Sequence, residues 1–195
     1  MPKFNDNERA IIKEKLLVKA KQLFNRYGIK KVTVDDLVSG IGIAKGSFYA
    51  FFESKEHLYT EILFSIQNRL LADTEIFLKE NESLNPRELT KRLVSWSFDE
   101  VKKYPLLLHH DIELLSYLMR KLPKDVLDRY SDINVQTAQL LAEHNIKFKC
   151  ETKTVVGVFQ ALSVVYDNMI VKTEMGSKDV MDILISGVVN EIVEE

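Results

Sequence analysis

The sequence is poor in residues that cross-link or interrupt a chain: among 195 residues it has one cysteine, seven glycines and four prolines. A single cysteine, Cys150, excludes an internal disulfide, so we expect a protein of the reducing cytoplasm. The first ten residues, MPKFNDNERA, contain no apolar run of the kind found in secretory signals. No segment approaches the roughly 18 consecutive apolar residues that suggest a membrane span. We therefore expect neither secretion nor insertion into a bilayer.

Charge is unevenly distributed along the chain, although the formal net charge is only −2. Residues 1–55 contain 11 Lys and Arg against 6 Asp and Glu, whereas residues 56–195 contain 16 against 23. Apolar residues make up 46% of the chain, which is enough to bury a core in one or two domains. A basic first third joined to an acidic remainder suggests that one end meets a polyanion such as nucleic acid.

Strand-like alternation of useful length is absent, and apolar residues recur at three- and four-residue steps almost throughout. Thr33 and Ser54 are candidate N-caps, Gly28 is a candidate C-cap, and several prolines stand where a helix can begin. These signals predict an all-α protein. The expected helices are 8–28, 33–39, 44–52, 54–79, 86–103, 105–121, 123–145, 152–173 and 177–194.

The short segment 44–52 is unusual because it combines four aromatic residues with a glycine in a helical pattern. On a helical wheel Ala44, Phe48, Phe51 and Phe52 face the core, Gly46 and Ala50 point outward, and Lys45, Ser47 and Tyr49 lie on the flanks. Glycine inside a helix costs about 1 kcal/mol relative to alanine, so a close-approaching partner would explain it. With the helix at 33–39 and the turn at 40–43, the segment forms a helix-turn-helix suited to a major groove.

The stretch TVDDLVSGIGIAKGSFYAFFESKEHLY resembles the helix-turn-helix of the TetR family of bacterial transcriptional regulators. The resemblance implies a three-helix DNA-binding domain over residues 10–70 and a helical ligand-binding and dimerisation domain over residues 71–195. It implies that Thr33, Tyr49 and Lys55 anchor the DNA backbone, and that Lys45, Gly46 and Ser47 read base edges. Hydroxyl, phenol and ammonium groups are suitable donors to phosphate.

Two residues depart from the family pattern. Ala44 stands where a capping serine or threonine is usual, so the short helix lacks a side-chain cap, which typically contributes about 1 kcal/mol. Phe51 stands where tyrosine or histidine is common, so one polar contact to phosphate is expected to be missing.

The last two expected helices carry broad apolar surfaces, and Gly157 and Ala161 would let another helix approach closely. One reading is a deep core within the chain. The family resemblance instead implies a homodimer through the helices at 152–173 and 177–194, which would present two recognition helices to a pseudo-palindromic operator.

An effector pocket in the middle helices is a further implication of the resemblance. The candidate residues are large or adaptable: Trp96, Tyr117, Met119, Phe159, Tyr166 and Met169. Each could equally be ordinary core, and the sequence does not identify a ligand.

One cluster, His109-His110-Asp111 with Glu113, could be considered for a metal, but only His109 and Glu113 share a helical face. We expect no metal or cofactor and no enzyme, because recognisable catalytic and phosphate-binding motifs are absent. The expected function is a dimeric, ligand-responsive repressor, with the helix at 54–79 joining its two regions. The alternative is a helical module that binds a protein or an apolar small molecule without DNA.

Overall fold

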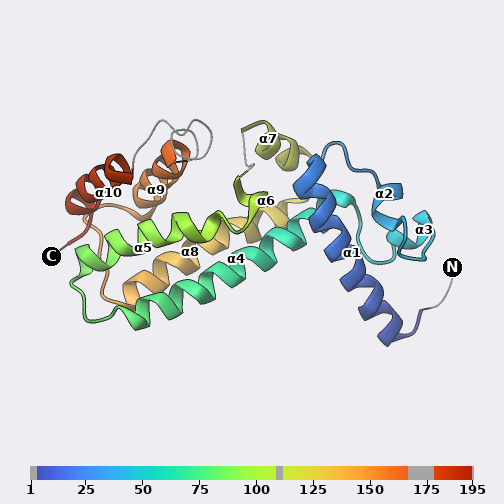
Figure 1. The fold of residues 1–195 in the computed structure, drawn as a ribbon, viewed down its shortest axis with the longest axis horizontal. Helices are drawn as coiled ribbons and strands as arrows, with labels where there is room; N and C mark the ends of the chain where they lie inside the picture. Colours follow the sequence, from blue (N-terminus) through green and yellow to red (C-terminus); the bar gives the residue numbers. More distant parts are fainter. Residues whose placement is uncertain (1–3, 109–111, 167–177, 195) are drawn as a thin grey trace. The chain divides into compact units, whose positions relative to one another are not determined.

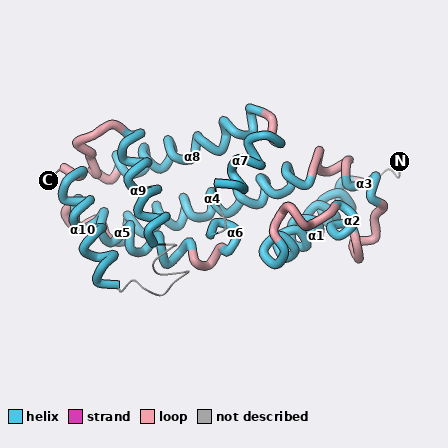
Figure 2. Tube along the Cα trace, turned by 90° about the horizontal axis from the view of Figure 1, so that it is seen from above, coloured by secondary structure: helices cyan, strands magenta, loops and turns pink. Residues whose placement is uncertain are grey.

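The computed structural model describes residues 4–108, 112–166 and 178–194, and within these ranges it contains helices and loops (Figures 1 and 2). The helices are α1 (Asp6–Tyr27), α2 (Val34–Val38), α3 (Lys45–Phe48), α4 (Lys55–Glu80), α5 (Pro86–Val101), α6 (Pro105–Leu108), α7 (Ile112–Lys121), α8 (Lys124–Glu143), α9 (Thr152–Tyr166) and α10 (Lys178–Ile192). Phe148 and Val193 form an isolated antiparallel bridge. The prediction of an all-α fold is confirmed.

The ends of α1 follow from local hydrogen bonding. Asn5 forms a capping box with Glu8, in which each side chain accepts from the other residue's backbone N–H at 2.9 Å. Gly28 ends the helix at φ 75°, and its N–H donates to Phe24 O at 2.9 Å. The predicted C-cap is therefore confirmed, while the helix begins two residues earlier than the apolar spacing indicated.

Side-chain caps account for the starts of α4 and α5: Ser54, which was predicted as a cap, and Asn85, which precedes the predicted start at Pro86. The Ser54 hydroxyl accepts from His57 N–H at 3.0 Å, and the Asn85 side chain accepts from Glu88 N–H at 3.0 Å ahead of Pro86. The single helix expected at 105–121 is represented by α6 and α7, with residues 109–111 between them outside the described residues.

The chain divides into two compact units, and the first comprises residues up to 67 together with 105–130. In this unit α1 packs against α2 and α6, and α2 packs against α3 (Figure 1). Its core is a set of almost fully buried apolar side chains: Leu16, Ala20, Phe24, Leu37, Phe48, Phe52, Leu58 and Tyr59. Because α1 supplies three of these at four-residue spacing, it forms the scaffold against which α2 packs, and α2 in turn packs against α3.

The second unit comprises residues 68–104 and 131–195. Here α10 packs against both α5 and α9, around a core that includes Leu78, Leu89, Leu162, Ile185 and Val189. Lys149 N–H donates to Ile192 O at 2.8 Å, which holds the end of α10 to the segment after α8. Across the described residues, no helix combines the length and the apolar character needed to cross a bilayer.

Candidate nucleic-acid interface

The first helix of the predicted helix-turn-helix, α2, is fixed by Thr33. The Thr33 hydroxyl accepts from Asp36 N–H at 3.2 Å, and Asp36 Oδ2 accepts from both the N–H and the hydroxyl of Thr33, at 2.8 and 2.6 Å. These bonds hold the pKa of the Asp36 carboxyl below its ordinary value, since they stabilise the charged form. Thr33 is thus confirmed as an N-cap, and its predicted phosphate contact remains a proposal.

The turn between α2 and α3 depends on two glycines. Gly40 has φ 78° and Gly42 has φ 88°, in the left-handed region that most other residues avoid. The chain therefore reverses over a few residues, and α2 and α3 pack directly against each other. This is the geometry that the sequence predicted for the turn.

The α3 segment, by which we mean residues 44–52, differs from the predicted helix in length. Only Lys45–Phe48 is α-helical, and the following turn has Ala50 N–H bonded to Ser47 O at 3.1 Å and Phe51 N–H bonded to Phe48 O at 2.9 Å. Because three-residue bonds wind the chain more tightly than an α-helix, a wheel drawn at 100° per residue misplaces some side chains.

The wheel was wrong for Ala44 and Ser47. Ala44 is exposed rather than in the core, because it precedes the helix as an extended N-cap residue. Ser47, which was expected on a flank, is only 5% exposed. Phe51 and Ala50 are both half-buried, while Phe48 and Phe52 enter the core as predicted.

Gly46 and Tyr49 provide the open part of the segment. Gly46 is exposed, and a Cβ added there would meet no heavy atom within 4 Å. Tyr49 is 52% exposed, and its ring lies edge-on to Phe48 with centroids 5.4 Å apart. The structure confirms that Ala44 provides no side-chain cap for α3. A small residue beside an exposed phenol leaves room for a large partner to approach the backbone.

Two lysines of the predicted interface already have partners within the chain. Lys45 Nζ lies 2.6 Å from Asp35 Oδ2 of α2, and this hydrogen bond raises the pKa of the lysine. Lys55 Nζ donates to the carbonyls of Ile29 at 2.8 Å and Val32 at 2.7 Å, in the loop that leads to α2. The sequence did not predict that Lys45 pairs with Asp35 or that Lys55 binds these two carbonyls, because partners separated by a turn or a loop leave no periodic signal.

Three of the residues expected to line an effector pocket, Trp96, Phe159 and Tyr166, are described in the second unit. Trp96 stacks on Phe77 with ring centroids 4.8 Å apart, and Tyr166 stacks on Phe98 at 4.4 Å. Phe159 packs against the apolar core of that unit. These three residues therefore belong to the core of the second unit or pack against it.

The other three candidates differ from this group. Tyr117, in the first unit, donates its hydroxyl to the buried carboxylate of Glu56, and burial followed by this bond raises the pKa of Tyr117 to about 12. Met119 is 59% exposed. Met169 lies outside the described residues.

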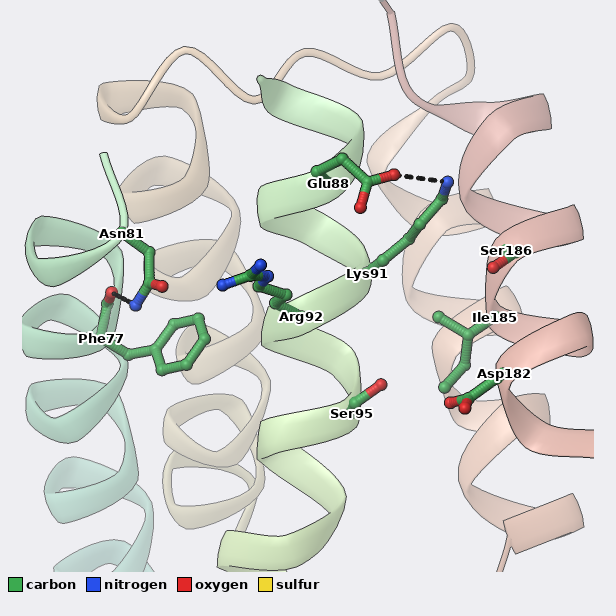
Figure 3. Close-up of a pocket in the computed structure, with 9 residues that line it drawn as sticks. All are labelled: Phe77, Asn81, Glu88, Lys91, Arg92, Ser95, Asp182, Ile185 and Ser186. Atoms are coloured by element: carbon green, nitrogen blue, oxygen red, sulfur yellow. Dashed lines mark hydrogen bonds and ion pairs between the residues drawn. The ribbon is translucent and has the colours of Figure 1, made fainter. Parts of the chain in front are cut away.

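Each unit has a hollow at its surface. A groove of about 440 Å³ crosses α5 in the second unit (Figure 3), lined by Phe77, Asn81, Glu88, Lys91, Arg92, Ser95, Asp182, Ile185 and Ser186. A smaller one, of about 240 Å³, lies in the first unit and is lined by Phe24, Asn25, Arg26, Gly28, Ile29, Tyr59, Leu106 and Leu114. None of the described candidates for the effector pocket lines either hollow.

The metal hypothesis is not addressed by the structure. His109, His110 and Asp111 lie outside the described residues, and Glu113 pairs with Lys30. Within the ranges that are described, no group of three or more His, Cys, Asp or Glu side chains is arranged to hold a metal ion.

Helices α9 and α10 also carry exposed apolar residues. Val164 is 61% exposed and Ile183 is 71% exposed, and Val180 and Leu184 are each 37% exposed. Gly157 and Gly187 have open space where a Cβ would lie. Leu162, by contrast, is 5% exposed and belongs to the intrachain core. The two helices therefore supply both core residues and exposed apolar side chains.

Comparison with known proteins shows that the sequence of the first unit's helix-turn-helix is similar to those of bacterial regulators. Residues 16–62 match the family model described as "Bacterial regulatory proteins, tetR family". The chain is 32% identical over 82 residues to the uncharacterized HTH-type transcriptional regulator YdgC of Bacillus subtilis, covering 42% of each protein. It is 30% identical over 102 residues to the HTH-type transcriptional repressor KstR2 of Mycobacterium tuberculosis, covering 52% of this chain and 47% of that one. The matched segment thus spans less than half the length of either relative.

Solved structures extend the similarity to the whole fold. A TetR-family transcription regulator from Marinobacter aquaeolei superposes with a TM-score of 0.68 at 11% identity, covering 98% of this chain and 100% of that one. The fatty acid degradation regulator FadR from Bacillus halodurans superposes with a TM-score of 0.57 at 16% identity, covering 96% of each. At these identities the structures show a shared fold and nothing about ligands.

Proposed function

From the membership of this chain in the TetR family of bacterial regulatory proteins, we propose that it is a dimeric, ligand-responsive transcriptional regulator that represses by binding DNA. The observation that carries the proposal is the α2–turn–α3 arrangement, in which Gly46 and Tyr49 are exposed within the matched residues 16–62. An open, glycine-bearing surface on a short helix is what close approach to base edges requires.

The proposed DNA contacts combine backbone anchors and base readers. Thr33, Tyr49 and Lys55 are proposed to hold phosphates, and Lys45 and Gly46 to face bases. For Lys45 this requires its ammonium to share or leave Asp35, and for Lys55 it requires a phosphate to join the carbonyls of Ile29 and Val32. Ser47 is also among the proposed base readers, but its burial favours a packing role for its side chain.

We propose that the functional division lies near residue 70, with DNA binding in residues 10–70 and effector binding and dimerisation in residues 71–195. The residues proposed to line the effector pocket are Trp96, Tyr117, Met119, Phe159, Tyr166 and Met169.

An effector that weakens operator binding must, by linkage, itself bind the operator complex more weakly than it binds the free protein. Relatives named as regulators support a non-enzymatic role. We further propose that the protein acts in the cytoplasm.

The homodimer is proposed to form through the exposed apolar side chains of α9 and α10. Val164 and Ile183 are exposed there, and Gly157 and Gly187 permit close approach of helices from a second copy. A twofold pair would supply the second recognition helix that a pseudo-palindromic operator requires.

The test is selection of bound duplexes from a random pool, together with a gel-shift on the region upstream of the protein's own gene. Enrichment of a palindromic sequence, bound with a steep dependence on salt, is the expected result. If no duplex is enriched by the folded protein, it is not a sequence-specific DNA-binding protein.

A further inference from the structure

The α3 segment has little internal support for its conformation. Its helix is only four residues long, it includes Gly46, and Ala44 contributes no cap. Such a short helix has little stability of its own, since nucleating the first turn is unfavourable. Its geometry must therefore be set by residues outside the segment.

The start and the middle of the segment are held in evident ways. Asp35 of α2 pairs with Lys45 at 2.6 Å, at the first helical residue. Phe48 and Phe52 are buried at 0% and 2% exposure. These contacts leave the turn just before Phe52, at Ala50 and Phe51 near the end of the segment, only half-buried.

Side chains from the beginning of the chain reach this end. Arg9 Nη2 of α1 donates to Ala50 O at 3.0 Å, and the same guanidinium lies 5.1 Å from the centroid of the Phe51 ring. The Phe4 ring lies 5.8 Å from the Phe51 ring. Carbonyls at the end of a helical turn lack intrahelical donors, so a planar guanidinium supplies both a donor and a stacking surface there.

We propose that Arg9 is a positioning residue that fixes the end of the α3 segment, and that DNA recognition depends on it through this geometry. The role explains why phenylalanine is used at position 51, where the family commonly has a polar residue: the ring is a platform for Arg9 and Phe4. The alternative is that Arg9 simply contacts phosphate. The effect on recognition rests on the proposed DNA-binding function, whereas the effect on the segment does not.

The first experiment uses the free protein and follows hydrogen exchange of backbone amides. Ala50 and Phe51 N–H are bonded within the segment, so Arg9→Ala should accelerate their exchange about tenfold while amides in the middle of α1 keep their rates. Lys15→Ala is the matched control, because it removes an exposed positive charge from the same helix. Exchange in Arg9→Ala equal to that in Lys15→Ala would overturn the proposal.

The second experiment titrates the duplex that the wild-type protein enriches from a random pool and an unselected duplex of the same length. Arg9→Ala should bind the enriched duplex roughly tenfold more weakly than the wild type does. Its loss of affinity for the unselected duplex and its change in salt slope should be no larger than those of Lys15→Ala. Arg9→Lys keeps the charge but not the planar fork, so it should not restore binding.

Two results would contradict a positioning role for Arg9. A salt slope that falls by about one in Arg9→Ala but not in Lys15→Ala, with equal weakening on both duplexes, would make Arg9 a phosphate contact. Full rescue by Arg9→Lys would contradict positioning too. If the wild-type protein enriches no duplex, the proposed function fails, while the exchange measurement still decides whether Arg9 fixes the segment.

Discussion

At the residue scale, Gly46 offers a way to separate DNA recognition from folding. A side chain at this position points into open space, so Gly46→Glu should leave the free energy of unfolding unchanged or raise it by up to about 1 kcal/mol through helix propensity. A carboxylate in the proposed groove interface would lie beside bases and phosphates. Affinity for the selected duplex should fall by at least the roughly 1–3 kcal/mol of a mismatched base pair.

The control for this change is Gly46→Ala, which adds a methyl group without charge. It should fold equally well and lose less affinity than Gly46→Glu, as measured by melting curves and duplex titrations on the same preparations. A folded Gly46→Glu variant that binds normally would show that α3 does not touch DNA.

Lys55 allows a structural role and a phosphate contact to be compared in one variant. Lys55→Ala removes the donor of the Ile29 and Val32 carbonyls, so unfolding free energy should fall by about 1–3 kcal/mol. If the ammonium also meets phosphate, binding to all duplexes should weaken alike and the salt slope should drop by about one. Denaturant unfolding and titration at several salt concentrations give the two quantities; altered sequence preference with an unchanged slope would contradict the phosphate contact.

At the scale of elements, the stability of α3 can be raised by adding an N-cap. Ala44 has the extended backbone of an N-cap, with φ −74° and ψ 155°, but no hydroxyl to accept from the first free N–H groups. Ala44→Ser should raise stability by about 1 kcal/mol in thermal or denaturant unfolding. Ala44→Val, which cannot cap, should give no gain, and equal stability of the two variants would show that water already satisfies this end.

The hydrogen bond from Tyr117 of α7 to Glu56 of α4 predicts that the stability of the protein depends on pH in the alkaline range. The pKa of Tyr117 is raised to about 12 from an ordinary value of 10.0, so the folded state retains this proton where the unfolded state loses it. The resulting stability is present below pH 10 and is lost as pH rises from about 10 to about 12. In Tyr117→Phe this part of the pH dependence should disappear, and the highest step of the phenolate absorbance titration with it. An unchanged titration would assign that step to another tyrosine.

Element positions were predictable from sequence where the signal was local. Asn85 and Pro86, Ser54, Thr33 and Gly28 each act through neighbours within four residues, and each marks the boundary expected of it. The α3 segment was placed less well, because its tight turn departs from helical periodicity. Contacts over long sequence separations could not be read at all: Arg9 with Ala50 is separated by 41 residues and Tyr117 with Glu56 by 61.

At the scale of the whole molecule, substitutions in α9 and α10 can test whether the exposed apolar residues of these helices form a dimer interface. Ile183 is 71% exposed in the single chain, so Ile183→Glu should not disturb the folding of a protomer, as most exposed substitutions do not. In the proposed dimer the same carboxylate would be buried near its twofold copy without a partner, which is strongly unfavourable. Sedimentation should therefore show a folded monomer of 22.5 kDa for the variant and twice that mass for the wild type.

Leu162→Glu is the contrasting variant. Leu162 is only 5% exposed, so the new charge would lie in the intrachain core and the protein is expected to unfold. Because a monomer presents only one recognition helix, Ile183→Glu should also lose affinity for a palindromic duplex while retaining binding to unselected DNA. A wild-type protein that sediments as a folded monomer at micromolar concentration would rule out the dimer, and an Ile183→Glu variant that remains dimeric would place the interface elsewhere.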